Sequence, residues 1–224
     1  MLLFLQAKSI ILTVVPRPIA VVLKNNWKEA WSSSLQRTQI IVGTILMTAI
    51  SCMLPSFFNL IQKRNGVILN DWVLAAIPPH NVSWAIFTII WGFGLYALWR
   101  AIEKPAIYIT YVWSLIFVIV LRVLAISMVA LDPPKGLIAL TDPLTGVFYG
   151  ESNITKDLFF SGHTSIIYLA YLCLERKSDK MIALFSTIAV VLLLLVQHVH
   201  YTIDIIAAFI IVYPIHKGVK YLLG

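Results

Sequence analysis

The chain has 224 residues, of which 60% are hydrophobic and only 12% are charged, and its formal net charge is +7. Soluble domains carry about 45 to 50% apolar and about 25% charged residues, so this composition excludes a soluble globular fold, a disordered chain and a collagen-like repeat. The basic excess does not indicate nucleic-acid binding, because no basic stripe carries exposed aromatics, and two cysteines inside apolar runs indicate neither a disulfide nor a metal site.

Residues 1–37 form a separate N-terminal segment in our prediction. Apolar stretches alternate there with the basic residues Lys8, Arg17, Lys24 and Lys28. The order of these charges and the lack of a small-residue cleavage site do not fit a signal peptide. We expect an amphipathic helix that lies in the membrane interface, with Trp27 and Trp31 at the level of the lipid headgroups.

Residues 38–224 are predicted to form a domain of six transmembrane helices. Five segments contain no Asp, Glu, Lys or Arg, namely residues 38–62, 72–99, 105–121, 158–174 and 181–203. Each approaches or exceeds the length of about 20 residues that a membrane-spanning helix needs. The third segment continues through Arg122 to residue 131, and a sixth starts near Thr202 and includes Asp204. The predicted fold class is an all-α integral membrane protein with two ionisable residues inside its spans.

The distribution of basic residues predicts the orientation. Six spans place both termini on one face together with twelve basic residues, whereas the other face has five if Arg122 is counted. By the positive-inside rule the termini are cytoplasmic. The loop 132–157, rich in Pro and Gly, is then expected to be a structured cap on the periplasmic or exoplasmic face. The short loops favour a multi-pass protein of a bacterial cytoplasmic membrane.

Two histidines are predicted to meet at the outer edge of the membrane. His163 follows Ser161 and Gly162 at the start of the fourth span, and His200 precedes the sixth. If residues 200–204 are helical, His200 and Asp204 share a face, so that the carboxylate accepts one ring N–H and leaves the other nitrogen as a nucleophile. Arg122 needs an anion, which is either a lipid phosphate or a structural partner such as Asp157 or Asp204.

The sequence resembles the sphingomyelin synthase-like branch of the type-2 phosphatidic acid phosphatase superfamily. The matching strings are Asp157-x3-Ser161-Gly162-His163-Thr164 and His200-Tyr201-Thr202-x-Asp204-Ile205-x-x-Ala208. Leu121-Arg122 with Pro133-Pro134-x-Gly136 is similar to a third motif of that branch, and Asn70-Asp71 with Ile77-Pro78-Pro79 is a looser match to a fourth. The resemblance covers roughly residues 40 to 215.

The sequence also departs from patterns of this superfamily. The lipid phosphatases carry Lys-x6-Arg-Pro, but Ile10 stands where that Lys would precede Arg17-Pro18, and Leu194 occupies the Arg position of their Ser-Arg-x5-His motif. These differences favour the synthase-like branch. However, Thr155-Lys156 replaces the Cys-Gly that precedes the Asp in that branch, which leaves the substrate open.

The resemblance implies that a phospho-headgroup is transferred from a phospholipid to a ceramide or diacylglycerol hydroxyl through a phosphohistidine. His200 is then the nucleophile, Asp204 orients it, and His163 is the general acid and base. The implied substrate-binding residues are Arg122, Lys156, Asp157, Ser161, Thr164 and Tyr201. For Ser161 a plain helix cap is the structural alternative, and Asp157 either receives a headgroup cation or anchors Lys156. No metal or other cofactor is expected.

Two other functions compete with this interpretation. A lipid-phosphate phosphatase would use the same residues with water as the acceptor. A six-helix transporter would need polar groups at mid-bilayer on broken helices, whereas the polar groups here gather at one membrane edge. The headgroup, the acceptor and the oligomeric state are not specified by the sequence.

Overall fold

The computed structural model describes residue 23, residues 26–140 and residues 154–223, and the regular elements in these ranges are helices. Their bounds are α2 Trp27–Ser32, α3 Ser34–Gln62, α4 Trp72–Ala75, α5 Ser83–Glu103, α6 Pro105–Met128, α8 Gly162–Cys173, α9 Lys177–Val196 and α10 Thr202–Leu223. The described residues include no strand, although an isolated bridge joins Val67 to Leu131.

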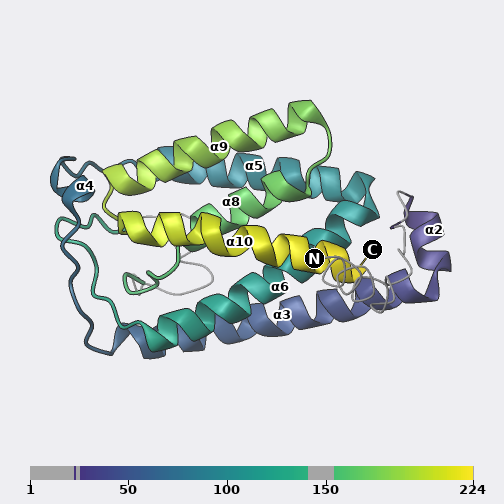
Figure 1. Cartoon of the computed structure of the whole chain (residues 1–224), viewed down its shortest axis with the longest axis horizontal. Helices are drawn as coiled ribbons and strands as arrows, with labels where there is room; N and C mark the ends of the chain where they lie inside the picture. The colour runs from purple at the N-terminus through teal and green to yellow at the C-terminus, as the bar shows by residue number, and fades with distance from the viewer. Residues whose placement is uncertain (1–22, 24–25, 141–153, 224) are drawn as a thin grey trace, which may run out of the picture.

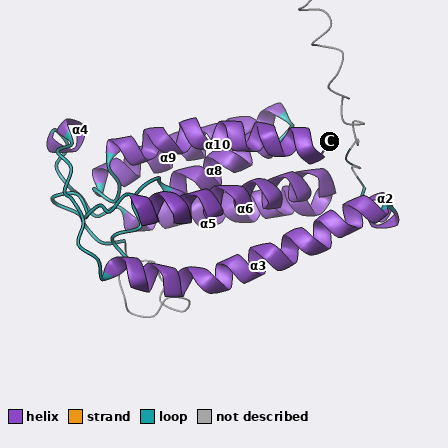
Figure 2. Ribbon diagram, turned by 60° about the horizontal axis from the view of Figure 1, so that its bottom comes forward, coloured by secondary structure: helices purple, strands orange, loops and turns teal. Residues whose placement is uncertain are grey.

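Five helices, α3, α5, α6, α9 and α10, are long and apolar enough to cross a membrane. They lie side by side with roughly parallel axes, and α3 runs along the outside of the bundle (Figures 1 and 2). The large apolar side chains that they expose are compatible with lipid contact. The predicted all-α, multi-pass membrane fold is therefore confirmed. α3 begins at Ser34, four residues before the predicted span, and α9 ends at Val196 rather than at residue 203.

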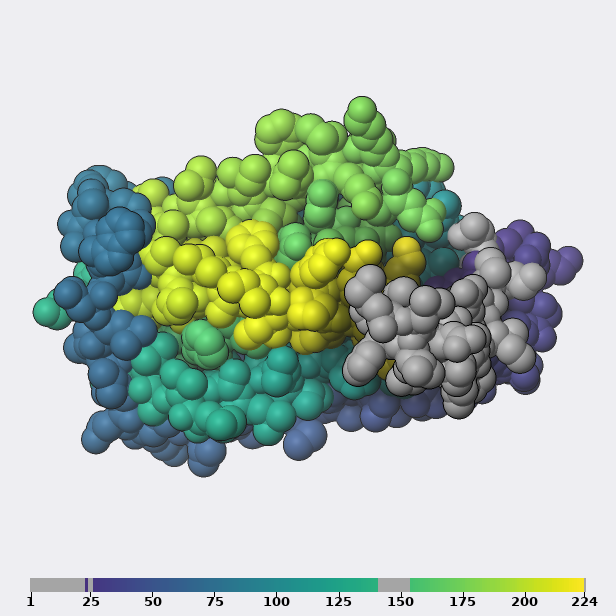
Figure 3. Space-filling model, in the orientation of Figure 1, coloured from purple at the N-terminus to yellow at the C-terminus, as the bar shows by residue number. Residues whose placement is uncertain are grey.

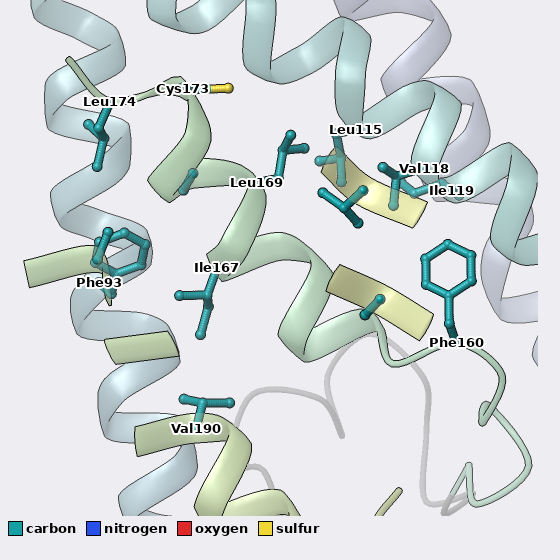
Figure 4. Packing of buried hydrophobic residues seen from close by; sticks show 14 of the residues in the cluster. Phe93, Leu115, Val118, Ile119, Phe160, Ile167, Leu169, Cys173, Leu174 and Val190 are labelled. Carbon is teal, nitrogen blue, oxygen red and sulfur yellow. The ribbon is translucent and has the colours of Figure 1, made fainter. Parts of the chain in front are cut away.

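The fourth predicted span, residues 158–174, is only partly helical. α8 has 12 residues, which gives a length of about 18 Å at 1.5 Å per residue and falls short of a hydrocarbon core of about 30 Å. The residues before it are not helical, and Leu158 and Phe160 are buried in the protein. α8 lies at the centre of the bundle, against α5, α6, α9 and α10 (Figures 1 and 4). Its apolar residues face protein more than lipid.

The bundle has two different ends. Two connections cover one end, residues 63–82, which include α4, and residues 129–140, and we call them the cap (Figures 1 and 3). α2 lies at the opposite end, which we call the far end (Figure 2). There Trp27 donates from Nε1 to the carbonyl of Ile102 at 2.6 Å and contacts the Tyr108 ring. The interfacial helix predicted for residues 1–37 is described only from Asn26 onward, apart from Leu23, so most of that prediction lies outside the described residues.

Candidate active site

Three elements bring the predicted catalytic residues together at the cap end. Arg122 lies near the end of α6, His163 lies in the first turn of α8, and Asp204 lies in the first turn of α10. His200 lies in the short connection between α9 and α10. Because α6, α8 and α10 pack against one another, these side chains converge from different parts of the chain.

His200 and Asp204 form a buried pair. The Nδ1 atom of His200 lies 3.4 Å from Oδ2 of Asp204, and the two side chains are 2% and 0% exposed. The predicted helical spacing is not the reason for this contact, because α10 begins at Thr202 and His200 precedes it. Instead, Oδ2 also accepts from the backbone N–H of Tyr201 at 3.0 Å, so Asp204 folds the chain back onto the start of its own helix. With Nδ1 on the carboxylate, Nε2 is the ring nitrogen that remains for chemistry.

His163 faces His200. The centroids of the two rings are 6.2 Å apart and the ring planes are inclined at 64° to each other. The start of α8 is fixed to α10 by a hydrogen bond from the backbone N–H of Ser161 to the carbonyl of Asp204 at 3.1 Å. A phosphorus atom between the two imidazoles could therefore be reached by both, as a nucleophile and a general acid require.

Arg122 is a buried cation beside these histidines. Its Nε donates to the carbonyl of Phe160 at 2.7 Å, and Nη2 donates to Oδ1 of Asp157 at 2.6 Å. Among the described residues, Nη1 has no hydrogen-bond partner. The guanidinium lies against Gly162 so closely that a Cβ there would be 2.8 Å from its central carbon. Glycine ahead of His163 thus lets the arginine approach the start of α8.

The protein itself engages three of the other predicted substrate-binding side chains. Lys156 forms an ion pair with Asp132 at 2.7 Å and also donates to the carbonyl of Arg64. Ser161 caps α8, because its hydroxyl accepts from the N–H of Thr164 at 3.4 Å. Tyr201 is 1% exposed, and its hydroxyl accepts from the N–H of Leu69 and donates to the carbonyl of Asp132. These three side chains thus have partners within the protein, and Asp157 pairs with Arg122 rather than with Lys156.

Two buried polar atoms of the site have no hydrogen bond within the part of the chain that the structure describes. They are Oγ1 of Thr164, a residue that is 1% exposed, and Oδ1 of Asp204. Buried polar groups are normally satisfied, so exceptions of this kind call for a functional explanation. The Thr164 hydroxyl remains able to donate to a ligand.

Asp71 and Gln197, which were not predicted to be site residues, hold the segment 197–202 against the cap. Asp71 accepts from the N–H of Thr202 at 2.7 Å and from its hydroxyl at 3.1 Å, and it also caps α4. The side chain of Gln197 binds both Val82 and Ser83, at 3.0 and 2.7 Å. Polar residues that flank an apolar run, such as Asp71 before Trp72, are the sequence signal that could have identified them.

His198 provides a further link to the cap. Its ring nitrogens each lie 2.9 Å from a backbone carbonyl, of Lys135 on one side and Ile77 on the other. The residue has a left-handed backbone with φ of 54°, which turns its ring away from the direction taken by His200. Together with Tyr201 and Asp71, it lines a cavity of about 430 Å³ in the cap, separate from the two catalytic histidines.

Burial and hydrogen bonding act in opposite directions on Asp71. Burial raises the pKa of its carboxyl, but hydrogen bonds from Thr202, Leu74 and Val73 outweigh burial and hold the pKa below the ordinary value of 3.8. The pKa of Asp132 is also low, because the ammonium of Lys156 binds the carboxylate. Both carboxylates are therefore charged at neutral pH. The described residues contain no group of three or more His, Cys, Asp or Glu side chains placed to hold a metal ion.

Residues 156–220 match a family model described as PAP2 superfamily C-terminal. The matched segment includes His163, His200 and Asp204 but not Arg122. The match supports the type-2 phosphatidic acid phosphatase superfamily, and with it an enzyme of the lipid phosphatase or phosphotransferase type. The comparison with curated proteins found no match to the chain.

Proposed function

We propose that this protein is a membrane lipid phosphotransferase that moves a phospho-headgroup from a phospholipid to the hydroxyl of a second lipid, of the ceramide or diacylglycerol type. One observation carries the proposal: the His200–Asp204 pair faces His163 across 6.2 Å between ring centroids, beside the guanidinium of Arg122. This arrangement offers a nucleophile, its orienting carboxylate, a general acid and a phosphate-binding cation in one place.

In the first step, Nε2 of His200 attacks the phosphorus of the donor lipid. A phosphorus–nitrogen bond forms, and the bond between phosphorus and the diacylglycerol oxygen breaks. His163, as an imidazolium, gives its proton to the departing oxygen, so that diacylglycerol leaves as a neutral alcohol. Asp204 accepts the Nδ1–H of His200 and stabilises the positive charge on the ring.

In the second step, neutral His163 takes the proton from the hydroxyl of the acceptor lipid. The acceptor oxygen attacks phosphorus, the phosphorus–nitrogen bond breaks, and His200 returns to its neutral form. Both steps develop negative charge on the phosphoryl oxygens. We assign its stabilisation to Arg122 and to the hydroxyl of Thr164, which has no other hydrogen-bond partner among the described residues.

Asp157 has a specific place in this scheme. Its carboxylate is 25% exposed and binds one side of the Arg122 guanidinium. A bound phosphate would take the remaining donors of Arg122, while Asp157 keeps the guanidinium oriented. The same carboxylate would be available to the cationic end of a zwitterionic headgroup. Lys156, Ser161 and Tyr201 support the site from outside it.

A lipid-phosphate phosphatase, with water as the second nucleophile, is the alternative function. The burial of His200 and Asp204, at 2% and 0% exposure, favours a lipid acceptor, because an intermediate on a buried histidine is shielded from water. The absence of the two phosphatase motifs from the sequence points in the same direction. The polar side chains of the candidate site gather at the cap end, which argues against a transport path through the centre of the bundle.

Mass spectrometry of lipids can test the proposal. The purified protein in nanodiscs would receive a phospholipid with an isotope-labelled headgroup, together with ceramide or diacylglycerol whose acyl chains differ from those of the donor. We expect the label on the acceptor lipid, and no such product with His200→Ala. Release of the labelled phospho-headgroup into water, at a rate that no acceptor changes, would instead show that water is the acceptor and that the protein is a hydrolase.

A further inference from the structure

Three lysines gather at the far end of the bundle, away from the candidate active site. Lys180 lies in the first turn of α9, and Lys217 and Lys220 lie near the end of α10. The start of α9 and the end of α10 lie at the same end of the molecule (Figure 1). All three lysines interact electrostatically with the buried His216, so their ammonium groups lie in the neighbourhood of this one side chain.

These lysines differ from Arg100 and Lys104 at the same end. Arg100 pairs with Asp179 and Glu103, and Lys104 pairs with Glu175 at 2.7 Å. No carboxylate within the described ranges pairs with Lys180, Lys217 or Lys220. Three cations that no described carboxylate neutralises attract an anion. The attraction is strongest at a membrane surface, where the lipid limits the access of water and salt to one side of the cluster.

Two of these lysines lie over tyrosine rings. The Nζ atom of Lys180 lies 5.6 Å from the centroid of the Tyr171 ring, and Nζ of Lys217 lies 5.6 Å from that of Tyr213. Tyr168 stacks with Tyr171 at 6.0 Å. Ammonium groups held over aromatic rings, with phenol hydroxyls beside them, are suited to the interface between lipid headgroups and hydrocarbon.

An exposed apolar stripe runs along α10 from Lys217 back toward the start of the helix. Ile206, Ile210 and Tyr213 are exposed, at 46%, 67% and 47%, and Lys217 follows them. The spacings of four, three and four residues place all of these side chains on one face of α10. This face thus has cations at the membrane surface and exposed apolar side chains at the depth of the acyl chains.

We propose that the lysine cluster of α9 and α10 binds an anionic phospholipid of the leaflet opposite the candidate active site. The phosphate of this lipid lies between Lys180, Lys217 and Lys220, and an acyl chain lies along Ile210 and Ile206. The occupant is a lipid rather than a soluble phosphate, because the exposed apolar stripe of α10 leads directly to Lys217 on the same helix face. The site is independent of the proposed transfer reaction.

Native mass spectrometry of the full chain can test this site. The protein would be titrated with phosphatidylglycerol and with phosphatidylcholine of identical acyl chains, and the mass of each bound lipid shows that it is intact. Each lysine near a lipid surface contributes about fivefold to the affinity for an anionic lipid. We expect the wild type to prefer phosphatidylglycerol, and the variant K180Q/K217Q to lose roughly 25-fold of that preference.

The matched control is K28Q/R37Q. Lys28 lies in α2 and Arg37 lies in the first turn of α3, both at the far end of the bundle. This variant removes the same amount of positive charge as K180Q/K217Q. The control should keep the preference, and K180R/K217R should restore it. An equal loss in the control would overturn the proposal in favour of general surface charge. If the double variant does not fold, K180Q and K217Q are measured singly, and an unchanged preference in both would also overturn it.

Discussion

Two arginines are buried at opposite ends of the bundle, and their partners differ. Arg100 at the far end is 1% exposed and is held by two carboxylates: Nε binds Asp179 at 2.7 Å and Nη1 binds Glu103. Asp179 also accepts from the hydroxyl of Tyr96 at 2.9 Å. Within the described ranges, Arg122 at the cap end has a single carboxylate partner, the 25% exposed Asp157, and one backbone carbonyl.

The difference separates a structural ion pair from a binding cation. A buried guanidinium is costly unless its donors and its charge are both compensated. At the far end the compensation is internal and joins α5 to α9. At the cap end one side of the guanidinium, with Nη1, has no partner among the described residues, so a substrate phosphate can complete it. The following predictions test this contrast.

The largest effect is expected at His200. His200→Ala should reduce transfer by on the order of 10³-fold or more, because no phosphohistidine can form. The free energy of unfolding should change far less than the activity. Lipid transfer and thermal unfolding would be measured on the same preparation. Substantial activity in this variant would show that another nucleophile attacks phosphorus.

His163→Ala should lower transfer from a natural phospholipid by roughly 10²- to 10⁴-fold, the usual contribution of general-acid catalysis. A nitrophenyl phosphodiester has a leaving group that needs no proton, so the burst of nitrophenol from the first turnover should be nearly unchanged in this variant and absent in His200→Ala. The absorbance of nitrophenol measures the release. Equal losses in the two variants would contradict the assigned roles.

The two arginines should separate activity from stability. Arg122→Ala should lower the rate per folded molecule by roughly 10²- to 10³-fold through lost phosphoryl stabilisation. Arg100→Ala should instead cost about 3–5 kcal/mol of stability, because Asp179 remains buried without its cation. Its folded fraction should keep normal turnover. Denaturant titration and lipid transfer distinguish the two results, and an exchange of the two phenotypes would refute the contrast.

Asp71→Ala should loosen the cap end and leave the far end unchanged. The carboxylate satisfies donors of both α4 and Thr202, so its loss should cost about 1–3 kcal/mol. Hydrogen exchange should rise at residues 71–75 and 200–204, and Asn70→Ala is the control. Because the pKa of Asp71 is lowered, its stabilisation is present at neutral pH and lost only as the pH falls below about 3.8. Loosening between pH 5 and 8 would contradict this role.

The smallest perturbation tests the orientation of the two ends. Single cysteines at Lys135 in the cap and Ser178 at the far end, with Cys52 and Cys173 replaced by alanine, should leave activity unchanged. An impermeant maleimide added to intact cells should label only the cysteine at position 135 if the cap faces away from the cytoplasm. Labelling of position 178 alone would reverse the predicted topology.

The sequence predicted the bundle well because long runs without charge are direct evidence of membrane helices. It overestimated the fourth helix for a physical reason. An apolar run has the same composition whether lipid or protein surrounds it, and Leu158 and Phe160 are buried by neighbouring segments rather than by lipid. Such burial depends on tertiary packing, which the local sequence does not contain.

The candidate site also has features that the local sequence predicted and features that depend on tertiary contacts. The spacing of His200 and Asp204 identified a pair, although a turn ahead of α10, and not a helix face, brings them together. The resemblance implied a substrate-binding role for Tyr201, and nothing in the sequence indicated that its hydroxyl donates to the carbonyl of Asp132, 69 residues away in the chain. Partners so distant are fixed by the folded chain. The role of Asp71 toward Thr202 was missed for the same reason.

The segment 197–202 has a consequence for how this protein can vary. Hydrogen bonds join four of its six residues to the cap, namely Gln197, His198, Tyr201 and Thr202. His200 instead contacts Asp204. The position of His200 therefore depends on the connections that form the cap as much as on the helices of the bundle. A graft that carries only the crossing helices into another scaffold would transplant the reactive side chains without the part that aligns them.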